Sequence, residues 1–453
     1  MGKYVSLTEQ VVLLGAGSAM FTKGLVADVI KQRWGGEIRL VDVDAHALET
    51  AIGLAKAMVD ISGADIVIRG STDRREMLPE STAVICTVGV GGRRAWEQDV
   101  LIPRAFGIFQ PVGDTVMPGG SSRALRMIPP MVEIARDVLE LSPQALFFNY
   151  GNPMSPVCRA IRKATGAPVI GLCHGVNSVA AYLAKALDVE VKKLKYTAAG
   201  INHLTWFTDL SVDGNDLGPA LGSKAQRISD QIREGLAKSD KRIFQSIDNP
   251  VSWELTNLTG AFPAVLDRHV TEFFPAMYGS QGAYYGKTLG VDIYNFEDVI
   301  KSGDDIFADM QRTARGDSEL PPDLLSSTSG EHEQVTDIIE SIRKNDGRTY
   351  SANIPNQGQI TGLPAESIIE CPCVAGQDGL IPRGSLKLPA VVIGTLATRF
   401  LWVETIVEAA LEGCMRKFAQ ALLIDGSVKD IGMAWELAET LVNAHKKHLH
   451  NFG

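Results

Sequence analysis

The stretch VVLLGAGSAMF, from Val11 to Phe21, predicts how the fold begins. An apolar run ends in Gly15-Ala16-Gly17 and an amphipathic segment follows, which is typical of a strand, a glycine turn and the start of a helix. Such a turn lets the backbone approach a pyrophosphate closely, while the free N–H groups and the positive end of the helix face the negative charge. We therefore predict a nucleotide site that includes Gly15, Gly17, Ser18, Met20 and Phe21.

The context of the glycine turn adds to this prediction. Met20 stands where the third glycine of G-x-G-x-x-G would fall, so the motif by itself is also compatible with a turn that only packs a helix on a strand. A second apolar run, Ile38–Val43, contains Asp42, 27 residues after Gly15. An acidic residue at the end of the second strand binds ribose hydroxyls, which favours NAD over NADP.

Length, charge and cysteine usage exclude several classes of protein. The chain has 453 residues, which allows up to about three domains. A formal net charge of -9 argues against nucleic acid or an anionic membrane surface as a partner. The N-terminus has no apolar signal core, and we expect no stretch long enough to span a bilayer. Six scattered cysteines do not resemble a disulfide framework, so we expect a cytoplasmic protein.

The first part of the chain alternates strand-like and helix-like segments. The strand-like runs are Val11–Leu14, Ile38–Val43, Ile66–Ile68, Val84–Val88, Ala145–Phe148 and Val169–Leu172. Strands that are buried on both faces read as continuous apolar runs. This pattern predicts an α/β fold, with a Rossmann-like, doubly wound parallel sheet in an NAD-binding domain over residues 1–200. A mixed α+β, largely helical domain for substrate, metal and oligomerisation is predicted over residues 201–453.

Two short motifs suggest a metal site. Cys173-His174 follows one apolar run and Asn202-His203 follows another. A thiolate and an imidazole can share one divalent metal, with substrate and water completing its shell. By themselves, the two residues are more typical of a buried cysteine and a core histidine than of a metal site.

Five motifs in order resemble one family. GAGSAMF, VGDTVMPGG, NYGNPM, GLCHG and AGINH, which lie between residues 11 and 207, resemble glycoside hydrolase family 4. These glycosidases use NAD and a divalent metal, usually manganese. The resemblance implies cleavage of an α-glycoside by oxidation at C3, removal of the C2 proton, elimination of the aglycone and addition of water, outside the two-carboxylate scheme.

The resemblance also implies roles for individual residues. Cys173 and His203 match the metal ligands, and Asp114 matches the general acid, which must hold its proton near neutral pH. Asp267 is the candidate base for the C2 proton. Since some members use a tyrosine instead, Tyr278, Tyr284 and Tyr285 are alternatives, and Tyr285 is the one we assign to the catalytic residues. Asn152 would bind sugar hydroxyls, and His174 would lie beside the metal and substrate.

The substrate is predicted from three arginines. Arg93, Arg94 and Arg268 can pair with a sugar carboxylate or sulfonate, which favours an anionic hexoside such as a galacturonide or a sulfoquinovoside. A neutral α-glucoside or α-galactoside is the alternative within the family. An NAD-dependent dehydrogenase of a 2-hydroxy acid and a non-catalytic NAD or sugar sensor are the alternatives outside it. Family members are commonly dimers or tetramers, so we expect a homo-oligomer.

Overall fold

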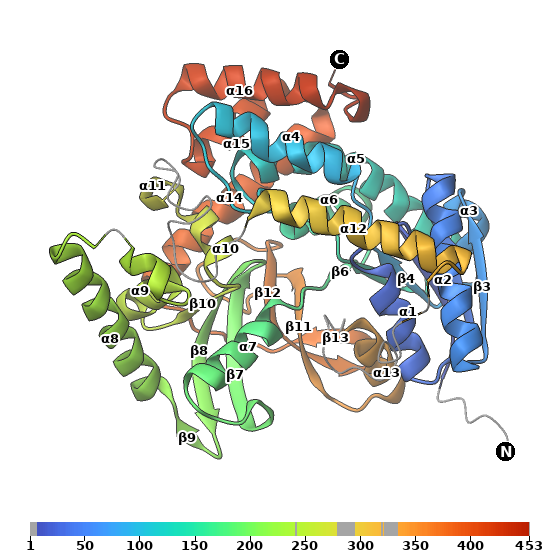
Figure 1. The fold of residues 1–453 in the computed structure, drawn as a ribbon, viewed down its shortest axis with the longest axis horizontal. Coiled ribbons are helices and arrows are strands. Elements are labelled where there is room, and N and C mark those ends of the chain that lie inside the picture. The colour runs from blue at the N-terminus through green and yellow to red at the C-terminus, as the bar shows by residue number, and fades with distance from the viewer. Residues whose placement is uncertain (1–6, 241, 279–294, 319, 321–333, 453) are drawn as a thin grey trace.

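A computed structural model describes residues 7–240, 242–278, 295–318, 320 and 334–452, which are built around one sheet (Figure 1). The strand order is β10-β8-β7-β12-β11-β6-β5-β4-β1-β2-β3, with β13 paired to β12 and β9 paired to β8. One half of this sheet is parallel and the other half is antiparallel.

The parallel half confirms the predicted Rossmann-like arrangement. Its strands are β1 (Thr8–Leu14), β2 (Gly35–Val41), β3 (Ile66–Ser71), β4 (Ala83–Cys86), β5 (Leu146–Asn149) and β6 (Ile170–Gly171). They pair in parallel in the order β3-β2-β1-β4-β5-β6. All four residues of β4 are buried, as a strand covered on both faces requires.

Helices connect these strands. They are α1 (Thr22–Lys31), α2 (Ala45–Ser62), α3 (Arg74–Met77), α4 (Gly92–Ala105), α5 (Met117–Leu141), α6 (Met154–Thr165) and α7 (Gly175–Ala186). The start of α2 follows from its sequence, because the Asp44 carboxylate accepts the backbone N–H groups of His46 and Ala47. Gly63 ends the same helix with a φ of +61°, which a glycine adopts readily.

The antiparallel half continues the same sheet. Its strands are β7 (Leu194–Ile201), β8 (Leu204–Val212), β9 (Asn215–Asp216), β10 (Phe262–Ala264), β11 (Thr349–Pro355), β12 (Ile368–Gly376) and β13 (Gly379–Pro382). The late strands β11 and β12 lie between β6 and β7. The predicted boundary at 200/201 therefore falls at the end of β7, inside the β7–β8 hairpin, and the two predicted domains share one sheet.

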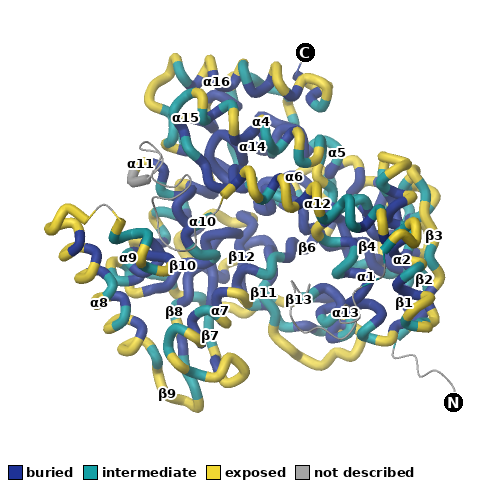
Figure 2. Tube along the Cα trace, viewed as in Figure 1, coloured by how far each residue is buried: buried dark blue, intermediate teal, exposed yellow. Residues whose placement is uncertain are grey.

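The remaining helices confirm the helical character of the C-terminal part. They are α8 (Gly218–Ala237), α9 (Pro250–Thr259), α10 (Asp267–Val270), α11 (Pro275–Tyr278), α12 (Phe296–Arg315), α13 (Val335–Lys344), α14 (Ala390–Glu412), α15 (Met415–Asp425) and α16 (Ile431–Ala444). Short 3-10 turns are η1 (Val191–Lys193), η2 (Ile243–Ser246), η3 (Thr271–Phe273) and η4 (Lys446–His448). Buried residues follow the sheet, and exposed ones follow the outer faces of α8 and α16 (Figure 2).

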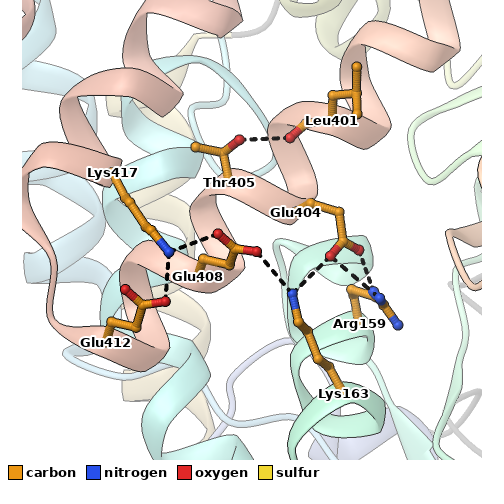
Figure 3. Close-up of polar contacts among 8 residues, drawn as sticks. All are labelled: Arg159, Lys163, Leu401, Glu404, Thr405, Glu408, Glu412 and Lys417. Carbon is orange, nitrogen blue, oxygen red and sulfur yellow. Dashed lines mark hydrogen bonds and ion pairs between the residues drawn. The ribbon is translucent and has the colours of Figure 1, made fainter.

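Helix α14 corrects one expectation. By length and composition alone it is long and apolar enough to cross a membrane, whereas the sequence was expected to contain no such stretch. In the fold it packs on α5, α6 and α15. A partly buried side of α14 carries Glu404, Glu408 and Glu412, which pair with Lys163 and Arg159 of α6 and with Lys417 of α15 (Figure 3). These contacts fit a core helix of this domain.

Candidate active site

The glycine turn lies between the ends of β1, β2 and β4. The backbone N–H groups of Gly15 and Ala16 donate to the carbonyl oxygen of Val41 at 2.9 and 3.0 Å. Gly15 has a φ of +86°, and a Cβ atom on it would lie 2.8 Å from the backbone nitrogen of Val88. Only glycine fits both conditions. The turn is thus held close to two neighbouring strand ends.

Asp42 fastens the second half of the turn. Its Oδ2 accepts the backbone N–H of Gly17 at 2.8 Å, and its Oδ1 accepts that of Asp44 at 3.0 Å. A Cβ on Gly17 would lie 2.6 Å from the Cβ of Ala47 and 2.9 Å from Asp42 Oδ2. The turn and the acidic end of β2 are therefore one packed unit. This close backbone cradle fits the phosphates and ribose of a dinucleotide.

The residues after the turn lead toward the loop that follows β5. Ser18 Oγ accepts the backbone N–H of Phe21 at 3.4 Å, and the Met20 side chain is exposed. The ring of Phe21 lies 5.3 Å from the ring of Tyr150, centroid to centroid. Asn152, two residues after Tyr150, donates from Nδ2 to Asp114 Oδ2 at 2.9 Å. The glycine turn and Asp114 are thus joined through the 150–152 segment.

Three side chains form a set that can hold a metal ion. Among the described residues, ligand atoms of Asp114, His203 and His269 all lie within 4.8 Å of one another. Asp114 comes from the loop before α5, His203 from the turn between β7 and β8, and His269 from α10. The two imidazole rings lie 4.0 Å apart. Nitrogen and oxygen donors at these distances suit a divalent cation such as Mn²⁺ or Zn²⁺.

The protonation state of the two histidines fits a ligand role. Burial lowers the pKa of His203 to about 4, and burial also lowers that of His269 well below its usual range. Both imidazoles are therefore neutral near pH 7. The Thr115 hydroxyl donates to Asp114 Oδ1 at 2.6 Å and lies 2.7 Å from His203 Nδ1. Because its one proton goes to Asp114, His203 Nδ1 carries the proton toward Thr115 and Nε2 keeps its lone pair.

His269 supplies a second observation in favour of a cation. Its Nδ1 is buried and has no hydrogen-bond partner among the described residues. A buried nitrogen without a partner is unfavourable unless a ligand satisfies it. The donor set therefore fits the metal that the sequence predicted, with His269 as an additional candidate ligand.

Asp114 differs from what the sequence argument required. Burial raises the pKa of its carboxyl, but His203, His269 and Arg123 together lower the pKa by more than burial raises it. The pKa of Asp114 therefore lies below its usual range. Since the imidazoles are neutral near pH 7, Arg123 is the cation that acts there. These surroundings favour the ionised form of Asp114, whereas the role of general acid requires the protonated form.

Cys173 and His174 lie at the end of β6. The half-buried Cys173 accepts the backbone N–H of Gly175 on its Sγ at 3.4 Å. Cys173 and His174 line a small cavity with Tyr150, Leu172, Gln334 and Ser351. His174 lies near enough to the three-residue set to contribute to the lowered pKa of His203 and His269. Cys173 lies outside that set.

The side chain of Asp267 is hydrogen-bonded to the first turn of helix α9. Its carboxylate accepts the backbone N–H groups of Val251 and Ser252 at 2.9 and 2.8 Å and the Ser252 hydroxyl at 2.6 Å. The side chain is 5% exposed. These contacts cap the first turn of α9 and favour a structural role over that of the C2 base.

Comparison with known proteins decides the family. The model described as "Family 4 glycosyl hydrolase" matches residues 10–189, and its C-terminal domain matches residues 198–428. The chain belongs to the family 4 glycosyl hydrolases. It is therefore a glycosidase, as the resemblance implied.

Relatives of this family 4 glycosyl hydrolase carry several activities. An α-galactosidase of Bacillus subtilis (strain 168) is 28% identical over 93% of this chain and 95% of its own length. An α-galacturonidase of the same organism is 28% identical over 94% and 95%. The solved structure of a 6-phospho-α-glucosidase from gut microorganisms, in complex with NAD and Mn²⁺, superposes with a TM-score of 0.82 at 19% identity over 97% of this chain and 99% of that one.

Two predicted substrate residues of this family 4 glycosyl hydrolase have different surroundings. Arg94 is exposed and pairs with Glu97 and with Asp304 of α12, which Arg93 also contacts. Both arginines thus join α4 to α12, and these contacts favour a structural role over binding of the substrate. Arg268 instead lies close enough to His269 to lower its pKa.

Of the predicted tyrosines, Tyr278 ends α11, while Tyr284 and Tyr285 lie outside the described residues.

Sequence reasoning missed two residues of the site. His269 directly follows Asp267 and Arg268, two residues that the sequence analysis named, so a third imidazole there was the available signal. Glu272 is fully buried, and its Oε1 accepts the backbone N–H groups of Val112 and Gly113 at 2.8 Å each. Burial raises the pKa of Glu272 well above its usual range. It holds the turn that leads into Asp114, and no spacing in the sequence indicates this.

Proposed function

We propose that this chain is an α-glycosidase that works with NAD and a divalent metal, Mn²⁺ in the first instance, on an anionic hexoside such as a galacturonide or a sulfoquinovoside. The observation that carries the proposal is the connection between the two parts of the site. Phe21 beside the glycine turn contacts Tyr150, and Asn152 orients the carboxylate of Asp114 within the metal-binding set. A dinucleotide and a cation held there would meet at one sugar.

The chain's own residues divide the work of the reaction. When bound, NAD takes up and returns a hydride, and the metal stabilises negative charge on the sugar oxygens. The turn at Gly15 and Gly17 would hold the pyrophosphate, and Asp42 would lie beside the ribose. Cys173 and His203, supplemented by His269, would hold the metal.

Proton transfers complete the proposed sequence of C3 oxidation, C2 deprotonation, elimination and water addition. Asn152 would bind sugar hydroxyls and orient Asp114, which would take up a proton before passing it to the leaving oxygen. Since Asp267 caps α9, the C2 base is a choice between Asp267 and the tyrosines at 278, 284 and 285.

Two observations support an anionic sugar. Arg123 lies close enough to Asp114 to lower its pKa and donates from Nε to the Asn152 carbonyl at 3.0 Å. Arg268 lies near His269. Positive charge near two members of the metal-binding set favours a carboxylate or sulfonate on the substrate. Relatives named α-galacturonidase agree with this choice, and neutral α-galactosides are the competing class.

The cysteines support a location for the protein, and the family resemblance supports an assembly. The structure shows all six cysteines as free thiols, which fits the reducing cytoplasm. We propose a homo-oligomer, either a dimer or a tetramer, on the resemblance alone. Light scattering of the purified protein measures the assembly directly.

The decisive experiment incubates the protein with NAD, Mn²⁺ and a panel of aryl α-glycosides in deuterated water. We expect turnover of the galacturonide or sulfoquinovoside, deuterium at C2 of the product and no accumulation of NADH. Cys173→Ser should lose metal-dependent turnover and keep NAD binding, while Cys414→Ser, at another half-buried cysteine, should keep both. Hydrolysis without deuterium at C2 contradicts the mechanism. Steady accumulation of NADH indicates a dehydrogenase, and cofactor binding without turnover indicates a sensor.

A further inference from the structure

A buried polar group lies beside the turn that carries His203. Its centre is Glu370 on β12, which is 1% exposed. Glu370 Oε2 accepts the side-chain N–H of Asn202 at 3.1 Å, and Oε1 accepts the Ser351 hydroxyl at 3.4 Å. The side chain of Asn353 also hydrogen-bonds to this carboxylate. Asn202 immediately precedes His203, so the carboxylate is one residue away from a proposed metal ligand.

The strand register places this group in one row across the sheet. Gly171 of β6 pairs with Asn353 of β11, Asn353 pairs with Glu370 of β12, and Glu370 pairs with Gly200 of β7. Residues aligned in this way present their side chains to the same face. The row therefore runs from the strand before Cys173 to the strand before His203.

Contacts reach both ends of the row. At the β6 end, Asn353 Nδ2 donates to the carbonyl oxygen of Gly171, two residues before Cys173, at 3.4 Å. Ser351 lines the same small cavity as Cys173. At the β7 end, Asn202 is fixed by Glu370. One carboxylate thus receives donors that are attached to both proposed ligand segments.

His203 needs such support. Its φ of +66° is a left-handed conformation that costs a residue other than glycine about 1 kcal/mol or more. The surroundings must hold the turn in this conformation. The partners of Glu370 are two amides and a hydroxyl, so an ionisable carboxyl is buried among neutral groups. A buried carboxyl in such surroundings is unfavourable, and its role as an acceptor for three donors accounts for its presence.

We propose that Glu370 is a positioning residue for the metal site. It would hold, through Asn202 and Asn353, the turns that present His203 and Cys173. The inference rests on the proposed function, since it takes these two residues as ligands. Outer residues that orient metal ligands typically change metal affinity by about 10- to 100-fold when they are removed.

Metal binding in the full chain tests the proposal. Glu370→Ala removes all acceptor atoms, and we expect it to raise the Kd for Mn²⁺, measured by electron paramagnetic resonance of the free ion, about tenfold or more. Glu370→Gln keeps one acceptor oxygen for three donors, so we expect an intermediate Kd. The Kd for NAD should stay within about twofold. Glu9→Ala is the matched control, because Glu9 is also buried on a strand but pairs with Arg343, and it should lower stability without changing Mn²⁺ binding.

A Co²⁺ spectrum supplies a readout that a loss of stability alone does not change. A thiolate ligand gives Co²⁺ a charge-transfer band in the near ultraviolet, which we expect in the wild type and not in Cys173→Ser. We expect Glu370→Ala to shift this band or the ligand-field bands, and Glu370→Gln to restore them in part. If the wild type shows the band, and both Glu370 variants have the same spectrum and the same Mn²⁺ affinity as the wild type, the inference is overturned and the proposed metal site is not. Equal effects in Glu9→Ala also overturn it. A wild type without the band overturns the proposed metal site and the inference together.

Discussion

Asp267→Asn separates a structural carboxylate from a catalytic base. The carboxylate of Asp267 accepts three hydrogen bonds at the start of α9, from Val251 and Ser252, at 2.6–2.9 Å. The side chain is buried, so water replaces none of these contacts readily. An asparagine has the same shape, but it turns one acceptor into an N–H donor that faces backbone N–H groups. The substitution therefore removes acceptors without opening a cavity.

The magnitude follows from these contacts. A hydrogen bond to a charged group contributes about 1.5–3 kcal/mol, and the loss of a helix cap costs about 0.5–2 kcal/mol. Asparagine keeps one oxygen, so one or two of the three bonds are lost. We expect Asp267→Asn to lower the free energy of unfolding by about 2–4 kcal/mol. Since α9 carries the buried Trp253, the first turn of the helix should loosen around a fluorescent reporter.

The assay combines urea unfolding, followed by tryptophan fluorescence, with the rate at which the C2 proton of the substrate exchanges into deuterated water. For a cap, unfolding shifts and the exchange rate falls by less than about tenfold. A catalytic base typically contributes about 10²- to 10⁴-fold. An unchanged free energy of unfolding, with exchange slowed a hundredfold or more and normal NAD and Mn²⁺ binding, would refute the structural reading and make Asp267 the base.

Three further predictions test other parts of the structure. Gly17→Ala places a Cβ atom 2.6 Å from the Cβ of Ala47, and such overpacking costs about 1–3 kcal/mol. We expect this cost to raise the Kd for NAD about 5- to 150-fold. The control Gly222→Ala, which has open space around it, should leave the Kd for NAD unchanged. Burial raises the pKa of Glu370 from 4.5 to about 7, so folding disfavours its ionised form. Between about pH 4 and pH 8, the free energy of unfolding of the metal-free wild type should therefore fall by about 3 kcal/mol relative to that of Glu370→Gln. A difference in unfolding free energy between the two proteins that stays constant with pH contradicts this. Arg94→Ala should keep kcat/KM within about twofold, and a fall of tenfold or more would return Arg94 to the substrate site.

The parallel half of the fold was predictable because its signals are local. Strands covered on both faces need continuous apolar runs, and Val11–Leu14 and Val84–Val88 show them directly. The insertion of β11 and β12 between β6 and β7 was not predictable in this way. Asn353 pairs there with Gly171 and Glu370 pairs with Gly200, partners that lie 182 and 170 residues earlier in the chain, and no turn or periodicity encodes such a pairing.

The candidate site shows the same difference between local signals and contacts that are distant in sequence. The short sequence motifs GLCHG and AGINH led to Cys173 and His203. The contacts of Asp267 were not predictable, because its partners, residues 251 and 252, precede it by 16 and 15 residues and become visible only when α9 is in place. The surroundings of Asp114 were not predictable for a similar reason, because its neighbours His203 and His269 come from two distant elements. Residue type and motif suggest a chemical group, but its partners decide its charge.

The inserted strands also set a geometric condition on the proposed metal site. Neighbouring strands lie about 4.8 Å apart, so the three spacings between β6 and β7 separate Gly171 from Gly200 by about 14 Å. Cys173 lies two residues beyond this row and His203 three residues beyond it. At about 3.3 Å for each extended residue, these segments reach far enough for both side chains to share one ion only if they bend toward each other. The left-handed turn at His203 is one such bend, and Cys173 still lies outside the three-residue set. The width of the row therefore limits the ligand spacing, and the role proposed for Glu370 is to hold the two ligand turns across that width.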